Sequence, residues 1–152
     1  MTHEPVFTPR NSQYEIETRR VFDQAPFIRL LGAELDGFHP GQCKTTLVLR
    51  PDHQQQDGFV HAGVQATLAD HTAGIAGVTL VAEGERVLTA EFKINLLRAA
   101  SGQKLECEAQ VLRPGRRLIV VESEVFACTC EARSLVAKAT VTLAVVSDNK
   151  ES

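Results

Sequence analysis

One long apolar segment dominates this chain of 152 residues. It runs from Gly58 to Ala82 and is built mostly from Ala, Gly, Val, Leu and Ile, with Asp70 as its single formally charged residue. A carboxylate that leaves water without a partner is strongly destabilising unless its pKa shifts. A fold that keeps an acid in such surroundings usually needs it, so Asp70 is the first candidate for a functional residue.

The same segment predicts a helix over 61–82, because its apolar residues continue without a turn signal. The first N–H groups of a helix have no acceptors within it, and the positive end of the helix dipole lies there. The helix would therefore carry oriented donors next to His61 and an acid a few turns later. An acyl-transfer site requires both a donor for the oxyanion and a base. Asp70 and His71 at the centre of the segment argue against a membrane span.

Composition excludes other classes of function. The net charge of −3 gives no basic field, and the chain lacks Trp and has only 5% aromatic residues, so no nucleic-acid partner is expected. The N-terminal residues contain no apolar signal region, which predicts a cytoplasmic protein with reduced thiols. Cys128 and Cys130 form a weak metal signal, and we interpret the cysteines as small apolar residues in strands. No metal or redox cofactor is expected.

Periodicity and turn signals predict the remaining elements. Ser12 and Glu15 match a capping box for a helix over 12–24, and residues 27–31 would add a short turn. Alternating residues predict strands at 33–38, 42–50, 86–97, 103–112, 117–128 and 134–146. In the strand at 86–97, Leu88 and Phe92 are expected on one face and Thr89 on the other.

These elements predict a single α+β domain. One-sided alternation implies an antiparallel sheet with one covered face, and only the 61–82 helix is apolar enough to cover it. We therefore expect a six-stranded antiparallel sheet wrapped around a long central helix. Residues 1–11 are expected to form a flexible leader, 12–147 the domain, and 148–152 a solvated tail.

Two segments resemble the hotdog-fold acyl-CoA thioesterases. Residues 58–64 with Asp70 resemble the His-Gly-Gly start of that family's central helix and the acid nine residues after the His. Residues 88–98 resemble the strand that follows the helix. The resemblance extends over about residues 20–146, and it is strongest to the phenylacetate-degradation (PaaI-like) group of the 4-hydroxybenzoyl-CoA thioesterase superfamily. It implies the hotdog fold and hydrolysis of an acyl- or aryl-CoA thioester to the free acid and coenzyme A.

The resemblance also implies a role for each matching residue. Asp70 would act as general base or nucleophile, and the Ala62 N–H would polarise the thioester carbonyl. Gln55 would orient the carbonyl or the water, and Thr89 would hold the water near the acid. The two halves would come from different subunits of a homodimer, which would pair further into a tetramer.

Further residues are expected to contact the substrate. His61 would mainly shape the turn before the helix, and Gly63 follows at the position next to Ala62, where the family has two glycines. The methyl group of Ala62 would narrow the approach of the acyl group without removing the N–H donor. Four arginines could meet the phosphates of coenzyme A, because guanidinium groups suit phosphate recognition: Arg98, Arg113, Arg116 and Arg117.

Other interpretations remain open at this point. Asp70 could pair structurally with His71, Lys93 or an arginine, and the hairpin arginines could simply keep a turn in water. The domain could bind acyl-CoA without hydrolysing it, as a sensor or carrier. A hotdog dehydratase fits less well, because those enzymes use an acid and a His in a different arrangement. Release of free thiol from an acyl-CoA distinguishes a thioesterase from an acyl-CoA-binding protein and from a dehydratase, because only the thioesterase produces it.

Overall fold

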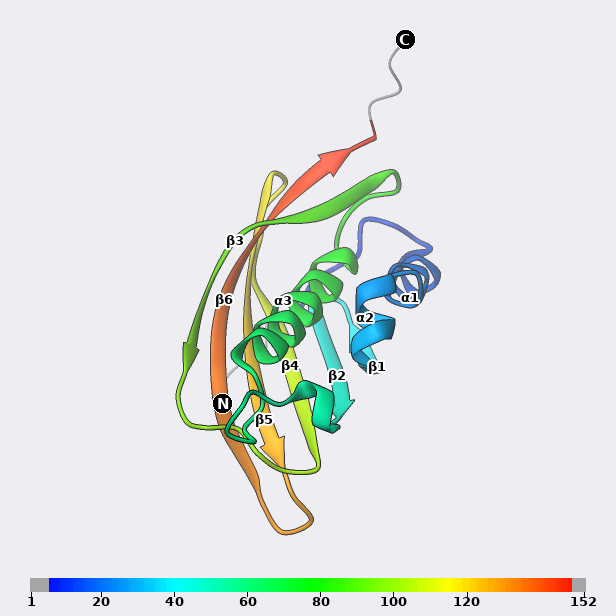
Figure 1. The fold of residues 1–152 in the computed structure, drawn as a ribbon. Helices are drawn as coiled ribbons and strands as arrows, with labels where there is room; N and C mark the ends of the chain where they lie inside the picture. Colours follow the sequence, from blue (N-terminus) through cyan, green and yellow to red (C-terminus); the bar gives the residue numbers. More distant parts are fainter. Residues whose placement is uncertain (1–5, 149–152) are drawn as a thin grey trace.

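The computed structural model describes residues 6–148 and confirms the predicted architecture. Six antiparallel strands form one sheet in the order β1-β2-β4-β5-β6-β3, which curves around the long helix α3 (Figure 1). Two shorter helices lie beside α3. The helices are α1 (Tyr14–Asp23), α2 (Pro26–Leu31) and α3 (Ala62–Val78). The strands are β1 (Glu34–His39), β2 (Gln42–Val48), β3 (Glu85–Leu96), β4 (Lys104–Pro114), β5 (Leu118–Cys128) and β6 (Arg133–Ser147).

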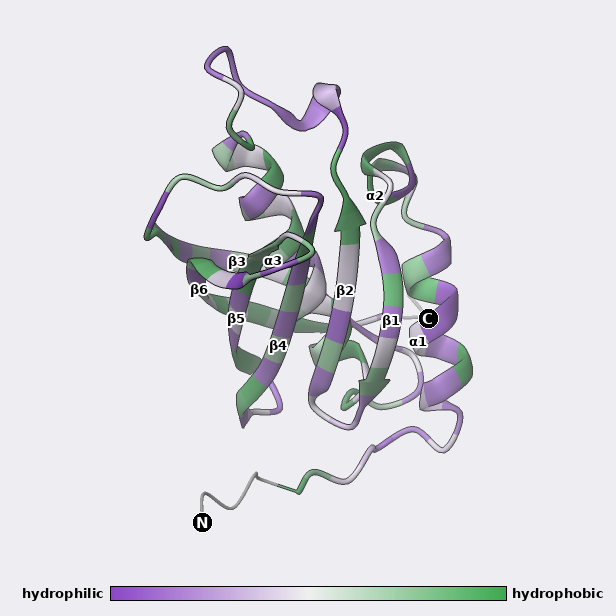
Figure 2. Cartoon of the chain, turned by 90° about the horizontal axis from the view of Figure 1, so that it is seen from below, coloured by the Kyte–Doolittle hydropathy of each residue, from purple (hydrophilic) through white to green (hydrophobic). Residues whose placement is uncertain are grey.

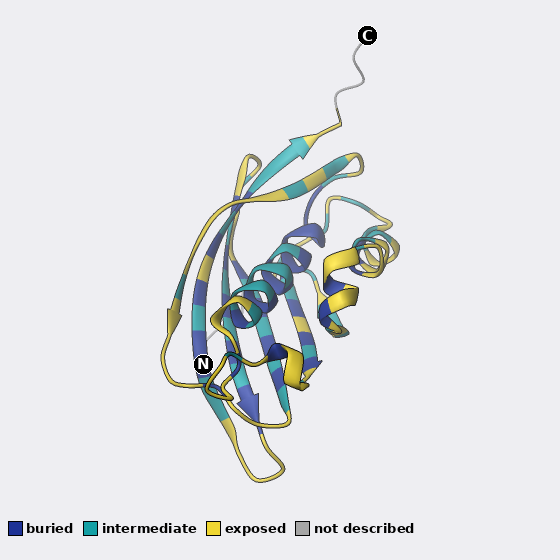
Figure 3. Ribbon diagram, viewed as in Figure 1, coloured by how far each residue is buried: buried dark blue, intermediate teal, exposed yellow. Residues whose placement is uncertain are grey.

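The core lies between α3 and the concave face of the sheet (Figure 3). Alternate residues of the central strands are buried there, as the sequence predicts, including Leu105, Val121 and Val141. Figure 2 shows the resulting alternation of hydrophilic and hydrophobic residues along β4. Small residues of α3, among them Ala73 and Gly77, face this layer and allow the helix axis to approach it closely.

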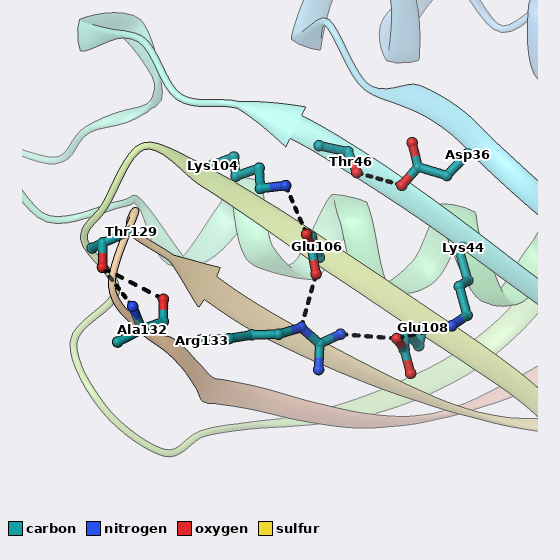
Figure 4. Close-up of polar contacts among 9 residues, drawn as sticks. All are labelled: Asp36, Lys44, Thr46, Lys104, Glu106, Glu108, Thr129, Ala132 and Arg133. Atoms are coloured by element: carbon teal, nitrogen blue, oxygen red, sulfur yellow. Dashed lines mark hydrogen bonds and ion pairs between the residues drawn. The ribbon is translucent and has the colours of Figure 1, made fainter.

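The convex face of the sheet carries a network of charged side chains (Figure 4). Arg133 bridges Glu106 and Glu108 at 2.8 Å each, while Lys104 and Lys44 bind the same two carboxylates from neighbouring positions. Hydrogen bonds from Lys104 and Arg133 lower the pKa of the Glu106 carboxyl to about 2. The strands thus alternate between an apolar inner and an ionic outer surface, which fixes their register.

The central helix is shorter than predicted. It ends at Val78 instead of residue 82, because Thr79 caps it: the Thr79 hydroxyl donates to the Ala76 carbonyl at 2.6 Å and accepts from Gly41 N–H at 2.8 Å. Leu80 and Val81 are still buried, so the apolar pattern continues beyond the helix. The sequence pattern therefore predicted the buried residues correctly and overestimated the length of the helix.

A β-bulge in β3 corrects the predicted alternation of that strand. The register against β6 shifts between Thr89 and Glu91, leaving Ala90 as the extra residue. Before the bulge Thr89 faces α3, and Leu88 is 57% exposed instead of sharing the inner face with Phe92. The extra residue exchanges the two faces of the strand, which strict alternation cannot anticipate.

The N-terminal region differs in detail from the prediction. Helix α1 begins at Tyr14, and the Ser12–Glu15 capping box does not form; Asn11 Oδ1 accepts from Gln13 N–H at 2.9 Å instead. Before it, Arg10 binds Glu85 through two hydrogen bonds and donates to the Leu80 carbonyl. The exposed Cys130 lies in the β5–β6 turn, outside the strands in which we expected the cysteines. Residues 1–5 of the predicted leader and 149–152 of the predicted tail lie outside the described residues.

Two glycines of α3 give a matched test of this packing. A Cβ at Gly77 would lie 2.4 Å from Cδ1 of the fully buried Leu143, whereas a Cβ at Gly74 meets no atom within 4 Å. We predict that Gly77→Val lowers the free energy of unfolding by about 1–3 kcal/mol through overpacking. Gly74→Val should change it by less than about 0.5 kcal/mol, because Val and Gly differ little in helix propensity. Urea unfolding measures both, and equal losses would contradict the close contact at Gly77.

Candidate active site

Asp70 lies halfway along α3 and faces the start of β3. The Thr89 hydroxyl donates a hydrogen bond of 2.7 Å to Asp70 Oδ1, so the helix and the edge strand are joined at the predicted acid. Asp70 is half-buried, and none of the described lysines, arginines or histidines forms an ion pair with it. The alternative in which Asp70 serves as a structural ion-pair partner therefore loses its support.

Two hollows meet at Asp70. The C-terminal hollow, of about 370 Å³, follows the second half of α3 between α1 and β3; it is lined by Val21, Asp70, Gly74, Val78 and Val87, among others. The N-terminal hollow, of about 400 Å³, follows the first half of α3 beside α2; it includes Phe27, Ala66, Thr67, Asp70 and Phe92. The carboxylate therefore reaches two cavities that extend from it in opposite directions along the helix.

His71 also lines both hollows. Its ring packs against Phe22 at a centroid distance of 5.2 Å, and its Nε2 is buried with no hydrogen-bond partner among the described residues. Burial lowers the pKa of the His71 imidazole to about 4. His71 therefore contributes a neutral ring to the walls at physiological pH.

At the start of α3 one backbone donor remains free. His61 is the N-cap, and its Nδ1 accepts from Gly63 N–H at 2.8 Å. The next two N–H groups, of Val64 and Gln65, donate to the His61 carbonyl. Among the first four helical residues of the described chain, only Ala62 has an N–H without an acceptor. The resemblance to the thioesterases assigns the polarising role to this same N–H, and that role stays a prediction.

Gln55 lies in the loop before the helix, where its contacts are with Asp57, Gly58 and Phe59. Its Oε1 accepts from the N–H groups of Asp57 and Phe59, and its own N–H donates to the Phe59 carbonyl at 2.8 Å. The side chain thus closes the turn that precedes α3. His53, which the sequence did not single out, anchors the same loop: its Nε2 donates to the Leu31 carbonyl, and its own carbonyl accepts from His61 N–H.

The two predicted halves of the site are far apart within one chain. Ala62 precedes Asp70 by eight residues on one continuous helix, which separates them by about 12 Å along the axis. A donor and a base that act on one carbonyl must lie within a few ångströms of the reacting atoms. A single chain therefore holds both parts without bringing them together.

The predicted phosphate-binding arginines are not gathered in one place. Arg113, Arg116 and Arg117 are exposed at the β4–β5 hairpin, on the side of the sheet where β3 begins. Arg98 is exposed just beyond the other end of β3, where its N–H donates to the Val136 carbonyl. Within one chain β3 thus separates Arg98 from the other three arginines, and the expected contact of the four with the phosphates of coenzyme A stays a prediction.

The profile of the Thioesterase superfamily (4HBT) matches residues 57–134, which include the α3 start, Asp70 and Thr89. The chain belongs to this superfamily. A solved structure of a thioesterase family protein from Silicibacter pomeroyi has a TM-score of 0.86 and 34% identity, covering 88% of this chain and 98% of that one. For a conserved protein from Pseudomonas aeruginosa the TM-score is 0.75 with 30% identity, over 84% of this chain and 98% of that one.

A solved structure with lower sequence identity also has the same fold. The structure of a thioesterase from Haemophilus influenzae has a TM-score of 0.79 at 22% identity and covers both chains completely, which supports the fold alone. No helix within residues 6–148 has both the length and the apolar character needed to cross a membrane.

The buried imidazole of His71 predicts a pH dependence of stability. Its pKa is about 4 in the folded protein against 6.5 ordinarily, so below pH 6.5 the unfolded chain binds a proton that the folded chain does not. Between pH 7 and pH 5 the wild type should therefore lose about 2 kcal/mol more unfolding free energy than His71→Gln. Urea unfolding of both proteins at the two pH values measures the difference, and parallel losses would contradict a neutral buried His71.

Proposed function

We propose that the protein is an acyl-CoA thioesterase, which hydrolyses an acyl- or aryl-CoA thioester to a carboxylic acid and coenzyme A. The observation that carries the proposal is the Thr89-held carboxylate of Asp70 at the junction of two hollows. A thioester has two substituents on its carbonyl, and the two hollows provide a direction for each. Membership of the Thioesterase superfamily supports the same reaction.

In this mechanism Asp70 accepts a proton from water. The water oxygen attacks the thioester carbonyl carbon, the carbonyl oxygen gains negative charge, and the C–S bond then breaks as the proton passes to the leaving thiolate. Thr89 donates to Asp70 Oδ1, which leaves Oδ2 to act as base and the hydroxyl lone pairs to accept from the water. Direct attack by Asp70 on the carbonyl is the nucleophilic variant of the same arrangement.

The oxyanion requires a donor that Asp70's own chain does not bring close, and we propose that a second copy supplies Ala62 N–H. β3 is a twelve-residue edge strand with exposed Leu88, Phe92 and Leu96, and such an edge is usually paired or covered. A homodimer in which the two β3 strands pair would cover it. The further pairing of dimers into a tetramer stays a prediction from the resemblance.

The direction of the strands supports this pairing. The Val60 N–H donates to the Ala100 carbonyl at 2.9 Å, so the α3 start lies beyond the Leu96 end of β3, whereas Asp70 is level with Thr89. In an antiparallel β3–β3 pair, each Leu96 end lies toward the Thr89 end of the partner strand. The free Ala62 N–H of one copy would then approach Asp70 of the other, accompanied by Gln55.

The other residues predicted to contact the substrate are His61, Gly63 and the four arginines. His61 holds Gly63 N–H, which leaves Ala62 as the free donor, so both would act by shaping the helix start. Antiparallel pairing also brings Arg98 of one copy toward the β3 start of the other, on the side of Arg113, Arg116 and Arg117. These exposed guanidinium groups are our candidates for the phosphates of coenzyme A. The grouping with the phenylacetate-degradation type of the superfamily stays a prediction from the resemblance.

Replacement of the base tests the reaction. Asp70→Asn should lower thiol release from acyl-CoA esters by about 10²–10⁴-fold, because the amide cannot accept the proton of water. The matched control is Asp23→Asn, which makes the same change at an exposed residue near the end of α1 and should retain wild-type turnover. Undiminished activity in Asp70→Asn would exclude this mechanism, and a wild type inactive on every ester would favour an acyl-CoA-binding protein.

Complementation tests whether the site is shared. Ala62→Pro removes only the N–H donor, since Pro suits the first helical position and His61 already has the extended conformation it requires. The variant alone should lose about 10²–10³-fold in turnover. Refolding it together with Asp70→Asn should restore about a quarter of wild-type activity, because half of the dimers are mixed and each has one intact site of two. A mixture no more active than its components would place the whole site within one chain.

A further inference from the structure

The two hollows at Asp70 differ in where they lie relative to the second copy, and this difference assigns them roles. The argument rests on the shared site proposed above. Partner Ala62 can reach Asp70 only if the first halves of the two α3 helices face each other. The N-terminal hollow lies along that first half, beside Ala66 and Phe92, and the partner's helix start would cover it. The C-terminal hollow lies on the far side of Asp70, along the second half of α3, beyond the point that the partner's helix start would reach.

Aliphatic side chains and paired charged side chains together line the C-terminal hollow. Val21, Ile75, Val87 and Leu143 contribute aliphatic groups to its walls. At the rim every arginine has a carboxylate partner: Arg20 binds Glu17, Arg86 binds Asp148 at 3.0 Å, and Arg10 binds the lining residue Glu85 at 3.1 Å. The two arginines that line this hollow are thus already paired, and its aliphatic groups are the part that an acyl chain can contact.

The shape of the hollow indicates the kind of acyl group. Its α3 wall extends from Asp70 to Val78, about 12 Å along the helix axis, between α1 on one side and β3 on the other. Among the described residues that line it, none is Phe, Tyr or Trp. A long aliphatic trough suits an extended hydrocarbon chain better than a ring that stops one bond from the carbonyl.

Gly74 is the residue that keeps this trough open. It lies one helical turn beyond Asp70, and a Cβ placed on it meets no atom within 4 Å. Its lack of a side chain is therefore not required by packing, in contrast to Gly77, where a Cβ would strike Leu143. Glycine in the middle of a helix is unfavourable. The empty space beside Gly74 has a use only if something other than the protein fills it.

We propose that the C-terminal hollow is the acyl compartment, that it takes a straight aliphatic chain, and that Gly74 and Val78 set the length it admits. Neutral His71 lines it next to the carboxylate. The acyl carbonyl would lie at Asp70, with the chain passing Gly74 and ending near Val78. This makes Gly74 a specificity-determining residue, distinct from the reacting groups of the site.

Opposite changes in volume test the proposal. Thiol release would be measured with acetyl-, butyryl-, hexanoyl-, octanoyl-, decanoyl-, benzoyl- and phenylacetyl-CoA. The wild type should prefer medium straight-chain esters to the two aromatic ones. Gly74→Leu should lower the ratio of kcat/KM for octanoyl-CoA to that for acetyl-CoA by at least about tenfold, because its side chain occupies the trough. Val78→Ala should shift the preferred length upward. Circular dichroism confirms that both variants fold.

The outcomes separate this inference from the proposed function. Thiol release by the wild type with an unchanged octanoyl-to-acetyl ratio in Gly74→Leu would overturn the acyl compartment and leave the thioesterase standing. An equal loss on every ester, or a preference of the wild type for the aromatic esters, would do the same. A wild type that releases thiol from no ester would overturn both. Shifts of the two variants in opposite directions support the compartment, since a purely structural defect would not depend on chain length.

Discussion

The close approach of α3 to the sheet governs the arrangement of the site. Ala73 and Gly77 are small enough for the helix to lie directly on the side chains of the central strands, and Leu143 fills the space opposite Gly77. That contact fixes the rotation of α3 about its axis. Asp70, His71 and Gly74 then face the two hollows, and the Thr89 hydroxyl finds Asp70 within hydrogen-bond distance. A different rotation would separate the acid from the edge strand.

The sequence predicted the architecture because local patterns and burial agree over most of the chain. Residues such as Leu105 and Val141 alternate with polar neighbours, and the strands they belong to are present within two residues of the expected bounds. The errors occur where a single residue breaks a pattern. Ala90 adds one position to β3, and Thr79 ends α3 by bonding to Gly41, a residue 38 positions away. Neither effect can be deduced from periodicity.

The candidate site was predictable in its chemistry and less so in its shape. Asp70 is conspicuous as the lone charge in an apolar segment, and the helix start indicates an N–H donor. Which N–H group of the helix start remains without an acceptor depends on the conformation of the His61 side chain. In this structure it accepts a hydrogen bond from Gly63 N–H, and Ala62 N–H is left free. The position of His71, and the empty space beside Gly74, depend on how α1 packs against α3. Such contacts between distant segments leave no periodic trace in the chain.

The proposed separation of the reacting groups from the acyl compartment has a consequence for how such proteins diversify. The reacting groups would require two copies in register, so a substitution at Ala62 or Thr89 would disturb the chemistry of the whole assembly. The trough past Gly74 is lined by α1, α3 and β3 of one copy, and Gly74 and Val78 lie on α3 and not on the edge strand through which the copies would pair. Mutations there could drift toward new acyl groups while turnover and assembly persist. Selection could therefore tune what the enzyme accepts independently of how it reacts.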